Sequence, residues 1–446
     1  MYPAPFKMRH FQNAMKSPLI RLCLFYFVGG GAILALCWLY IDPAVAKFLT
    51  LSWSAVGASL ALITYGGHFK KDNAIAHFAY LAGFAWLVVL AIVGALQITN
   101  LDLSRPESHS VTAVADVTLM ERINAVIPAE FSGQIVISNA EGVLYSGNFG
   151  YADREQKIPV TEKTLFDIGS VTKTYTATAI LKLAAEQKLG VDMSLSHWFE
   201  GLSELTGSIT VHQLLSHTSG LPQYSGDDDE ACDRSCFDTW LTTATLEFAP
   251  GEKYYYSNPG YSTLARIIEK ASGKTYEDYV VDDLVTPLDA GPIGYLRFPE
   301  SESYAVGYLD GQRMGMPQDL GWMDDGPPWH LRGNGGLLTS ASGLHRWLRA
   351  TADGRTLPAE WQSRQLERHA ERGDGIGYGY GWVIIERPSG IEIDHTGGNG
   401  FFFADARWFR DQGLLLTITS NAFDRQQIQT LLKNLRIALD IASEES

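Results

Sequence analysis

The first hundred residues alternate between long apolar segments and short polar ones, a pattern unlike that of the remaining chain. Apolar runs occupy about 22–41, 48–65 and 74–98, and none of them contains Asp, Glu, Lys or Arg. Each is about 18–25 residues long, enough for a helix to cross a hydrocarbon core of about 30 Å. The pattern predicts a membrane anchor over residues 1–100 with three transmembrane helices, the middle one weakened by three serines. A buried hairpin of a globular domain is the alternative.

Positive charge beside these segments predicts their orientation in the membrane. It lies before the first segment and between the second and third, at Lys7, Arg9, Lys16, Arg21, Lys70 and Lys71. Three crossings place both groups in the cytosol and everything after about residue 100 on the periplasmic or extracellular side. We therefore expect a multi-pass protein of the inner (plasma) membrane. Two crossings would instead leave the larger part of the chain in the cytosol.

Strand and helix patterns follow a polar linker at 101–114. Residues 131–150 alternate around a turn at Asn139–Gly142, which predicts a β-hairpin. After Ser170, apolar residues recur at helical spacing, at Ala177, Ile180, Leu181 and Ala184. Gly190 is expected to end that helix, because glycine commonly stands just past a helix C-terminus.

The end of the chain returns to strand patterns, at 380–386, 391–395, 401–408 and 414–420. An amphipathic helix at about 426–442 follows, and a turn-rich segment at about 191–330 predicts a helical insertion. Strands, then helices, then strands again favour an α/β (α+β) fold, an antiparallel sheet flanked by helices. This domain is expected to span 115–446.

The composition is that of a folded protein, since 46% of the residues are hydrophobic and 19% are charged. The net charge of −15 divides into +5 over residues 1–100 and −20 over the remainder. Such an acidic domain repels phosphate backbones, so we expect no nucleic-acid partner. Four cysteines are too few for a disulfide scaffold or a Cys-rich zinc domain. Cys232 and Cys236 form either a small local disulfide or two free thiols.

Ser170-Val-Thr-Lys173 is the only Ser-x-x-Lys in the chain. A serine hydroxyl becomes a strong nucleophile only when a neighbouring base takes its proton. If a helix begins at Ser170, Lys173 lies on the same face, and burial would lower the pKa of its amine towards that of a useful base. The free N–H groups of the helix start would meet a developing oxyanion. An ordinary helix cap followed by a solvated lysine is the alternative.

Tyr256-Ser-Asn258 is likewise the only Tyr-x-Asn. A phenol beside a cation can ionise and relay a proton, and an Asn amide can fix Lys173 or a substrate amide. The alternative is a tyrosine-rich turn of the core, because three tyrosines precede Ser257 without interruption.

His395-Thr396-Gly397-Gly398 ends one of the predicted strands. Small residues there allow an extended substrate to lie alongside as an additional strand. The main-chain N–H near Gly398 would supply a second oxyanion donor. No second His or carboxylate stands at ligand spacing from His395, so no metal is expected. A plain strand followed by a glycine turn is the alternative.

In this order, the three motifs resemble those of the serine β-lactamase-like superfamily. The branch of class C β-lactamases, D-Ala-D-Ala carboxypeptidases, D-aminopeptidases and esterases is the most similar. Three further segments resemble segments of the same superfamily: Leu214–Pro222, Gly335–Ser340 and Tyr378–Trp382. The resemblance covers about residues 115–440 and implies a β-lactamase/transpeptidase-like fold.

The resemblance also implies a role for each motif residue. Ser170 would form an acyl-enzyme, while Lys173 and Tyr256 would share the general-base and proton-relay work in an order left open. Asn258 and His395 would orient Lys173 and the substrate. The remaining residues of the third motif would bind substrate, at Thr396, Gly397 and Gly398. The scheme requires no metal or organic cofactor.

His395 departs from the pattern, because Lys is usual there in the β-lactamases that act on penicillins and cephalosporins. A neutral imidazole attracts a substrate carboxylate less than an ammonium does. We therefore expect a membrane-anchored serine acyl hydrolase whose small-molecule or peptide substrate is an ester, a D-amino-acid peptide or a β-lactam-like amide. One alternative is a non-catalytic penicillin-binding-type sensor or binder of cell-wall peptides on the same fold. Another is a membrane partner protein whose spans are its functional part.

Overall fold

The computed structural model describes residues 117–299, 302–422 and 424–441. The three predicted membrane spans and the whole of the predicted linker at 101–114 lie outside these ranges. Within them, no helix is both long and apolar enough to cross a membrane.

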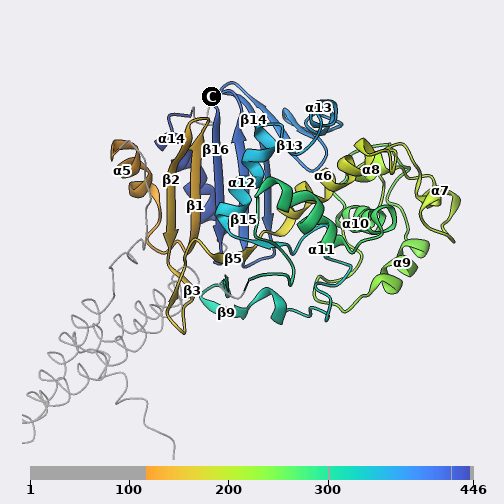
Figure 1. Ribbon diagram of the computed structural model, residues 1–446, viewed down its shortest axis with the longest axis horizontal. Coiled ribbons are helices and arrows are strands. Elements are labelled where there is room, and N and C mark those ends of the chain that lie inside the picture. The colour runs from red at the N-terminus through yellow and green to blue at the C-terminus, as the bar shows by residue number, and fades with distance from the viewer. Residues whose placement is uncertain (1–116, 300–301, 423, 442–446) are drawn as a thin grey trace, which may run out of the picture. The chain divides into compact units, whose positions relative to one another are not determined.

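An eight-stranded sheet runs through the centre of the described residues (Figure 1), and every neighbouring pair in it is antiparallel. In spatial order its strands are β11 (Ala370–Gly373), β12 (Ile376–Tyr378), β13 (Val383–Arg387), β14 (Gly390–Gly398), β15 (Phe403–Phe409), β16 (Leu414–Ser420), β1 (Gly133–Asn139) and β2 (Gly142–Phe149). The predicted hairpin is confirmed as β1 and β2, and its turn is closed by the Asn139 carboxamide, which accepts the N–H of Glu141 and Gly142. Pairing of β1 with β16 joins the two ends of the domain.

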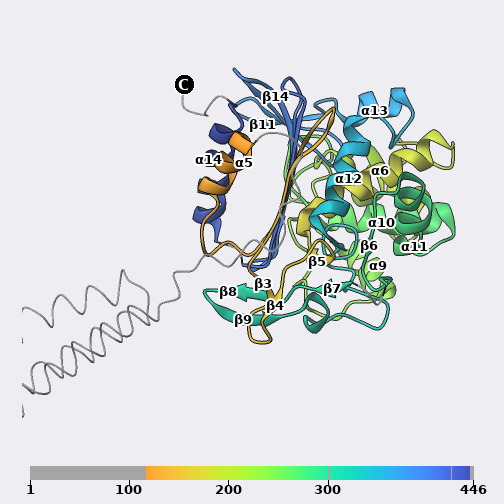
Figure 2. The same cartoon turned by 60° about the vertical axis from the view of Figure 1, so that its left-hand side comes forward.

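Helices cover both faces of this sheet, which confirms the predicted α/β architecture. Two helices lie together on one face, α5 (Val117–Val126) and α14 (Arg425–Ala438), as Figure 2 shows. They bury an apolar cluster against β1, β2, β15 and β16 that includes Ile123, Ile135 and Leu431. The opposite face carries α12 (Ala341–Ala352), with α6 (Thr172–Ala185) and α10 (Asn258–Ser272) in the same hydrophobic core.

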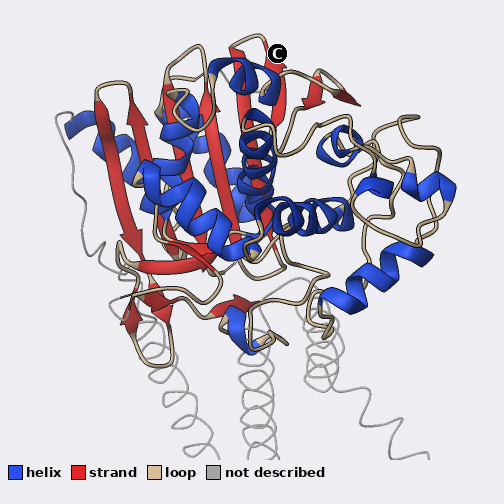
Figure 3. Cartoon of the chain, turned by 45° about the vertical axis from the view of Figure 1, so that its right-hand side comes forward, coloured by secondary structure: helices blue, strands red, loops and turns tan. Residues whose placement is uncertain are grey.

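The segment predicted as a helical insertion, 191–330, lies beside the large sheet (Figure 3). Its helices are α7 (Glu204–Gly207), α8 (Val211–Leu215), α9 (Arg234–Thr243), α10 and α11 (Tyr276–Asp278), followed by a π-helix at Tyr279–Val285. It also contains short strands: β6 (Ile293–Gly294), β7 (Ser303–Tyr304), β8 (Gly307–Leu309) and β9 (Gln312–Gly315). A second sheet, in the order β6-β10-β5-β7, links this segment through β10 (Leu338–Thr339) to β5 (Thr164–Asp167), the strand that leads into α6. The described strands and α-helices not yet named are β3 (Tyr151–Asp153), β4 (Ile158–Pro159) and α13 (Ala359–Gln365).

The expected end of α6 was wrong. The helix ends at Ala185, before Gly190, because Gln187 itself adopts the left-handed backbone conformation, with φ of 61°. The N–H groups of Gln187 and Lys188 then donate to the carbonyls of Ala184 and Leu183, so the last turn is closed without a glycine.

Candidate active site

Ser170 lies in a tight turn between β5 and α6. The turn is a 3-10 helix, η1 (Gly169–Val171), which continues directly into α6. The carboxylate of Asp167, at the end of β5, accepts the Gly169 N–H at 2.7 Å and the Asn399 side-chain amide at 2.9 Å. Gly169 has a φ of 49°, a conformation that favours glycine. These contacts hold Ser170 at the start of α6.

Lys173 places its amine beside the Ser170 hydroxyl. Its Nζ lies 3.1 Å from Ser170 Oγ and 2.7 Å from the carbonyl oxygen of Asn334. The side chain is fully buried, and burial lowers the pKa of the amine well below its usual value, an effect that the charge of Asp228 partly opposes. No salt bridge joins Lys173 to any carboxylate in the described part of the chain. A neutral amine in this position can accept the hydroxyl proton while its own N–H donates to Asn334.

Tyr256 stands next to both groups, just before α10. Lys173 Nζ lies 4.8 Å from the centre of its ring. Burial raises the pKa of the Tyr256 phenol far above its usual value, and hydrogen bonding to Ser170 lowers it only in part. The phenol is therefore protonated at neutral pH and is suited to donate a proton, whereas Lys173 is suited to accept one.

Two asparagines border the site, Asn258 and Asn334. The Asn258 amide was expected to fix Lys173 or a substrate amide. The hydrogen-bond acceptors described for the Lys173 amine are Ser170 and Asn334, not Asn258, and the substrate role of Asn258 stays a prediction. Asn258 Oδ1 is buried without a hydrogen-bond partner among the described residues, and it lines a cavity of about 370 Å³ that also contains Ser170. The sequence analysis missed Asn334, whose own amide donates to Ser262 Oγ at 2.9 Å and to the His330 carbonyl at 2.7 Å. In the sequence, the only feature that marks Asn334 as a candidate site residue is its position among three glycines, Gly333, Gly335 and Gly336.

The end of β14 approaches the Ser170 turn so closely that only glycines fit. A Cβ on Gly397 would stand 2.7 Å from the Ser170 amide nitrogen and closer still to the carbonyl oxygen of Ile168. A Cβ on Gly169 would likewise collide with the Gly398 amide. The backbone N–H groups of Ser170 and Gly398 are thereby brought together, the arrangement that an oxyanion requires.

The rest of the third motif borders the same space. Ser170, Tyr256 and the run His395–Gly398 line a cavity of about 670 Å³. The strand β13 pairs with β14 only as far as Asp394, whereas β15 pairs with it through Gly398. Thr396 and Gly398 are exposed in this stretch. An extended substrate can therefore lie along this part of β14.

His395 itself is a buried, uncharged member of the site. Its Nδ1 lies 2.8 Å from the Thr396 carbonyl, so Nδ1 carries the hydrogen and Nε2 accepts from the Tyr378 hydroxyl at 3.2 Å. Burial, aided by the nearby Lys173, lowers the pKa of the imidazole to about 3. It therefore offers a substrate carboxylate no positive charge near neutral pH.

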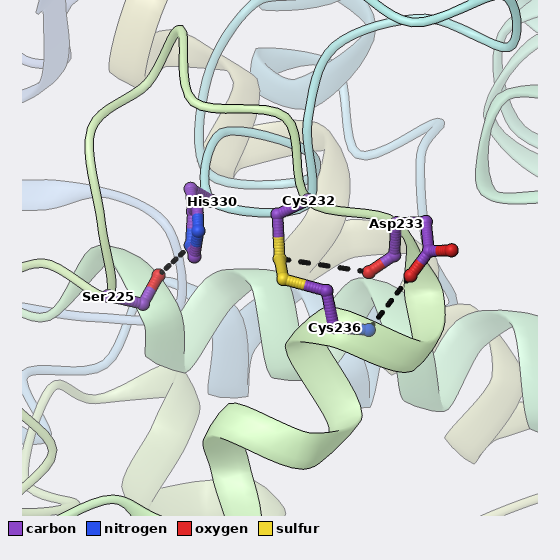
Figure 4. Close-up of a disulfide and its surroundings, with 5 residues drawn as sticks. All are labelled: Ser225, Cys232, Asp233, Cys236 and His330. Atoms are coloured by element: carbon purple, nitrogen blue, oxygen red, sulfur yellow. Dashed lines mark hydrogen bonds between the residues drawn. A yellow bond between two sulfur atoms is a disulfide. The ribbon is translucent and has the colours of Figure 1, made fainter.

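Cys232 and Cys236 form a disulfide, which decides between the two states that the sequence left open. Figure 4 shows it beside His330, whose Nδ1 hydrogen-bonds to Ser225 Oγ at 2.8 Å. The loop between Ser225 and Cys232 carries Asp228, which lines the smaller cavity beside Ser170. The three side chains Cys232, Cys236 and His330 are close enough to hold a metal ion, but both sulfur atoms are engaged in the disulfide.

Comparison with known proteins accounts for this arrangement. The Beta-lactamase family profile matches residues 128–439, which include all three motifs. The chain belongs to the β-lactamase family. This confirms the resemblance to the serine β-lactamase-like superfamily, and the homologues place the chain among its serine hydrolases.

Relatives of this β-lactamase-family chain differ in the activities that their names state. It is 29% identical over 327 residues to penicillin-binding protein 4* of Bacillus subtilis, which covers 68% of this chain and 71% of the relative. This chain is also 28% identical over 366 residues to esterase EstB of Burkholderia gladioli. That alignment covers 70% of this chain and 90% of the esterase. A class C β-lactamase structure superposes with a TM-score of 0.62 and 21% identity over 74% of this chain and 99% of that chain, which shows the shared fold.

Proposed function

We propose that this chain is a membrane-anchored serine acyl hydrolase that works through an acyl-enzyme on Ser170. The observation that carries the proposal is the buried Lys173 amine, 3.1 Å from Ser170 Oγ and without a carboxylate partner. A lysine kept uncharged in this way is a base, and a base beside a serine at a helix start is the arrangement that nucleophilic catalysis needs.

Acylation follows from the positions of the groups. Ser170 Oγ bonds to the substrate carbonyl carbon while its proton moves to Lys173 Nζ, and the N–H groups of Ser170 and Gly398 stabilise the oxyanion. Collapse of this adduct breaks the bond to the leaving alcohol or amine, which takes a proton from the Tyr256 hydroxyl. The Lys173 ammonium returns that proton to Tyr256, so both groups regain their starting states.

Hydrolysis of the acyl-enzyme repeats the sequence with water. The water oxygen bonds to the acyl carbon as its proton moves to Lys173, and the bond to Ser170 Oγ then breaks. Ser170 takes this proton from the Lys173 ammonium as the acid product leaves, so the serine hydroxyl and the neutral amine are both restored.

The substrate class follows from the third motif. The neutral His395 favours an ester or a D-amino-acid peptide over a β-lactam whose recognition depends on a carboxylate. The predicted spans over 22–41, 48–65 and 74–98 anchor the chain in the inner (plasma) membrane, with the catalytic domain on the periplasmic or extracellular side. The Cys232–Cys236 disulfide supports this placement, because disulfides persist in oxidising compartments.

The test is hydrolysis by the full-length chain and by Ser170→Ala. Purified protein is assayed with a 4-nitrophenyl ester, a D-Ala-terminated peptide and nitrocefin, and mass spectrometry follows acylation. We expect turnover of the ester or the peptide, a transient adduct on Ser170 and loss of both in the variant. Full activity in Ser170→Ala would overturn the proposal, and a stable adduct without turnover would favour a sensor or binder instead.

A further inference from the structure

An acidic loop borders the smaller of the two cavities that contain Ser170. Residues 227–230 are three aspartates and a glutamate, and of these Asp228 lines this cavity of about 370 Å³. Asp228 is exposed, and neither a hydrogen bond nor an ion pair engages its carboxylate among the described residues. This carboxylate is therefore available to a group of the substrate.

The loop that carries Asp228 is fastened on both sides of it. Three residues earlier, Ser225 Oγ hydrogen-bonds to His330 Nδ1 at 2.8 Å, and four residues later the disulfide joins Cys232 to Cys236 (Figure 4). A loop attached in this way loses little conformational freedom when its side chain binds a ligand. The position of Asp228 beside the reacting groups is thus a property of the free protein.

The charge of this cavity is negative. Its lining includes the carboxyls of Asp167 and Asp228 and no lysine, arginine or histidine. Burial raises the pKa of Asp167 to about 6, so this group is mainly ionised at pH 7 and above. Lost hydration raises the pKa of the Asp228 carboxyl, and the charge of Lys173 opposes this only in part. Since burial keeps the Lys173 amine uncharged, a cation in the cavity would be stabilised and an anion repelled.

Aromatic rings add a second kind of contact for a cation. Tyr224 lines the cavity and is 58% exposed, and the buried Tyr256 lines it as well. The Tyr224 hydroxyl accepts a hydrogen bond from Gln223 Nε2 at 3.2 Å. A ring and a carboxylate together are suited to an organic ammonium group. In the described part of the chain, the loop carboxylates are not among the side chains grouped closely enough to hold a metal ion.

The larger cavity, of about 670 Å³, has the opposite charge. Arg372 and Arg425 line it, and no carboxylate does. The two cavities meet at the nucleophile, because Ser170 and Tyr256 line both. A positive group on a substrate bound at Ser170 is therefore repelled from the larger cavity and attracted to the smaller one.

We propose that the cavity between Ser170 and Asp228 binds a positively charged ammonium group of the substrate, held by the Asp228 carboxylate and the Tyr224 ring. This inference rests on the proposed hydrolysis at Ser170 and names the class of substrate for that site. Esters or peptides that carry an ammonium group near the scissile carbonyl are hydrolysed in preference to neutral substrates of the same shape.

Isosteric esters test the proposal in the full-length protein. The 4-nitrophenyl ester of 4-(trimethylammonio)butanoic acid is compared with that of 5,5-dimethylhexanoic acid, in which carbon replaces the charged nitrogen. A second pair, acetylcholine and 3,3-dimethylbutyl acetate, places the same groups in the alcohol portion. Each kcat/KM is divided by the rate of hydroxide hydrolysis of the same ester, because an ammonium group itself activates a nearby carbonyl.

We expect the corrected kcat/KM to favour the cation by on the order of tenfold in at least one pair. The pair that shows the preference identifies the portion of the substrate that enters the cavity. The preference should shrink as the salt concentration rises, because salt screens an exposed carboxylate. The absence of a preference for the cation in both pairs would overturn the proposal.

Variants assign the preference to Asp228 and Tyr224. Asp228→Asn is expected to abolish it, measured as the ratio of the two corrected kcat/KM values within one pair. Tyr224→Leu should lower the ratio and Tyr224→Phe should retain it, because only the second keeps an aromatic ring. Asp229→Asn is the matched control, since it removes the same charge from the next residue of the loop, which does not line the cavity. A preference that survives in Asp228→Asn, or an equal loss in Asp229→Asn, would overturn the assignment.

Calorimetric titration into Ser170→Ala separates the two proposals. The ligands are the amides of the same two acids, one cationic and one neutral. Tighter binding of the cationic amide without any hydrolysis by the wild-type protein would retain the ammonium site and reject the hydrolase. Hydrolysis with no effect of the positive charge would do the reverse.

Discussion

Lys173 Nζ lies 3.1 Å from Ser170 Oγ, and its other hydrogen-bond acceptor is a backbone carbonyl, that of Asn334, not a carboxylate. Lys182, two and a half turns further along α6, differs in each respect. It is partly exposed and forms an ion pair with Glu186 at 3.2 Å. One helix thus carries a lysine whose burial favours the neutral amine and another that remains a surface ammonium.

Replacing Lys173 tests its role as the base. Lys173→Met is expected to lower kcat/KM for a nitrophenyl ester by on the order of a thousandfold, because the Ser170 proton loses its acceptor. Lys173→Arg should be equally inactive, since a guanidinium stays protonated. Lys182→Met is the matched control and should keep the wild-type rate, because it removes only a surface ion pair. A Lys173→Met protein with more than a tenth of wild-type kcat/KM would show that another group is the base.

The pairing of Ser170 with Lys173 could be predicted because it depends on one helical turn, and side-chain types at that spacing are visible in the sequence. The contribution of Asn334 could not, because it is a backbone carbonyl, which every residue type possesses, and it lies 161 residues away. The strands β13 to β16 were predictable from their apolar patterns, and β16 matches its predicted range of 414–420. The order of the segment 191–330 depends on long-range packing, to which no local pattern corresponds.

The buried carboxyl of Asp167 is expected to shape the pH dependence. Burial raises its pKa to about 6, despite hydrogen bonds from the Gly169 N–H and from Asn399. The carboxylate accepts both bonds, so protonation below about pH 6 loosens the turn that carries Ser170. Lys173 acts in the same direction, because a falling pH protonates the amine and removes the base. We therefore expect kcat/KM to decline as the pH falls through about 6.

Two variants separate these groups in a profile of kcat/KM against pH. Asp167→Asn has no carboxyl that can ionise at position 167. In this variant the part of the decline in kcat/KM below about pH 6 that is due to the carboxyl should disappear, while kcat/KM is lower at every pH. His395→Gln should leave the shape between about pH 5 and 8 unchanged, because the pKa of His395 is lowered to about 3. An acid limb that disappears in His395→Gln would assign the ionisation to the imidazole and contradict this account.

Gly397 permits the close approach of β14 to the Ser170 turn. Gly397→Ala is expected to lower kcat about a hundredfold or more, because its Cβ would stand 2.7 Å from the Ser170 amide nitrogen and push the oxyanion donors apart. Gly190→Ala is the control, since its Cβ would make an ordinary contact of 3.5 Å with Met193. Comparison of kcat with melting temperature is informative: unchanged kcat in a destabilised Gly397→Ala protein would place the glycine in packing alone.

The Cys232–Cys236 disulfide is expected to stabilise the loop that carries Asp228 into the space beside Ser170. A bridge across four residues contributes about 2 kcal/mol in the chain-entropy account. The paired substitution Cys232→Ser/Cys236→Ser should therefore lower the melting temperature, measured by differential scanning calorimetry. A reductant should lower that of the wild-type protein to the same value and leave the paired variant unchanged. The variant also controls for the other two cysteines, Cys23 and Cys37, because it retains both. An equal response of the two proteins to reductant would mean that the disulfide does not stabilise this loop.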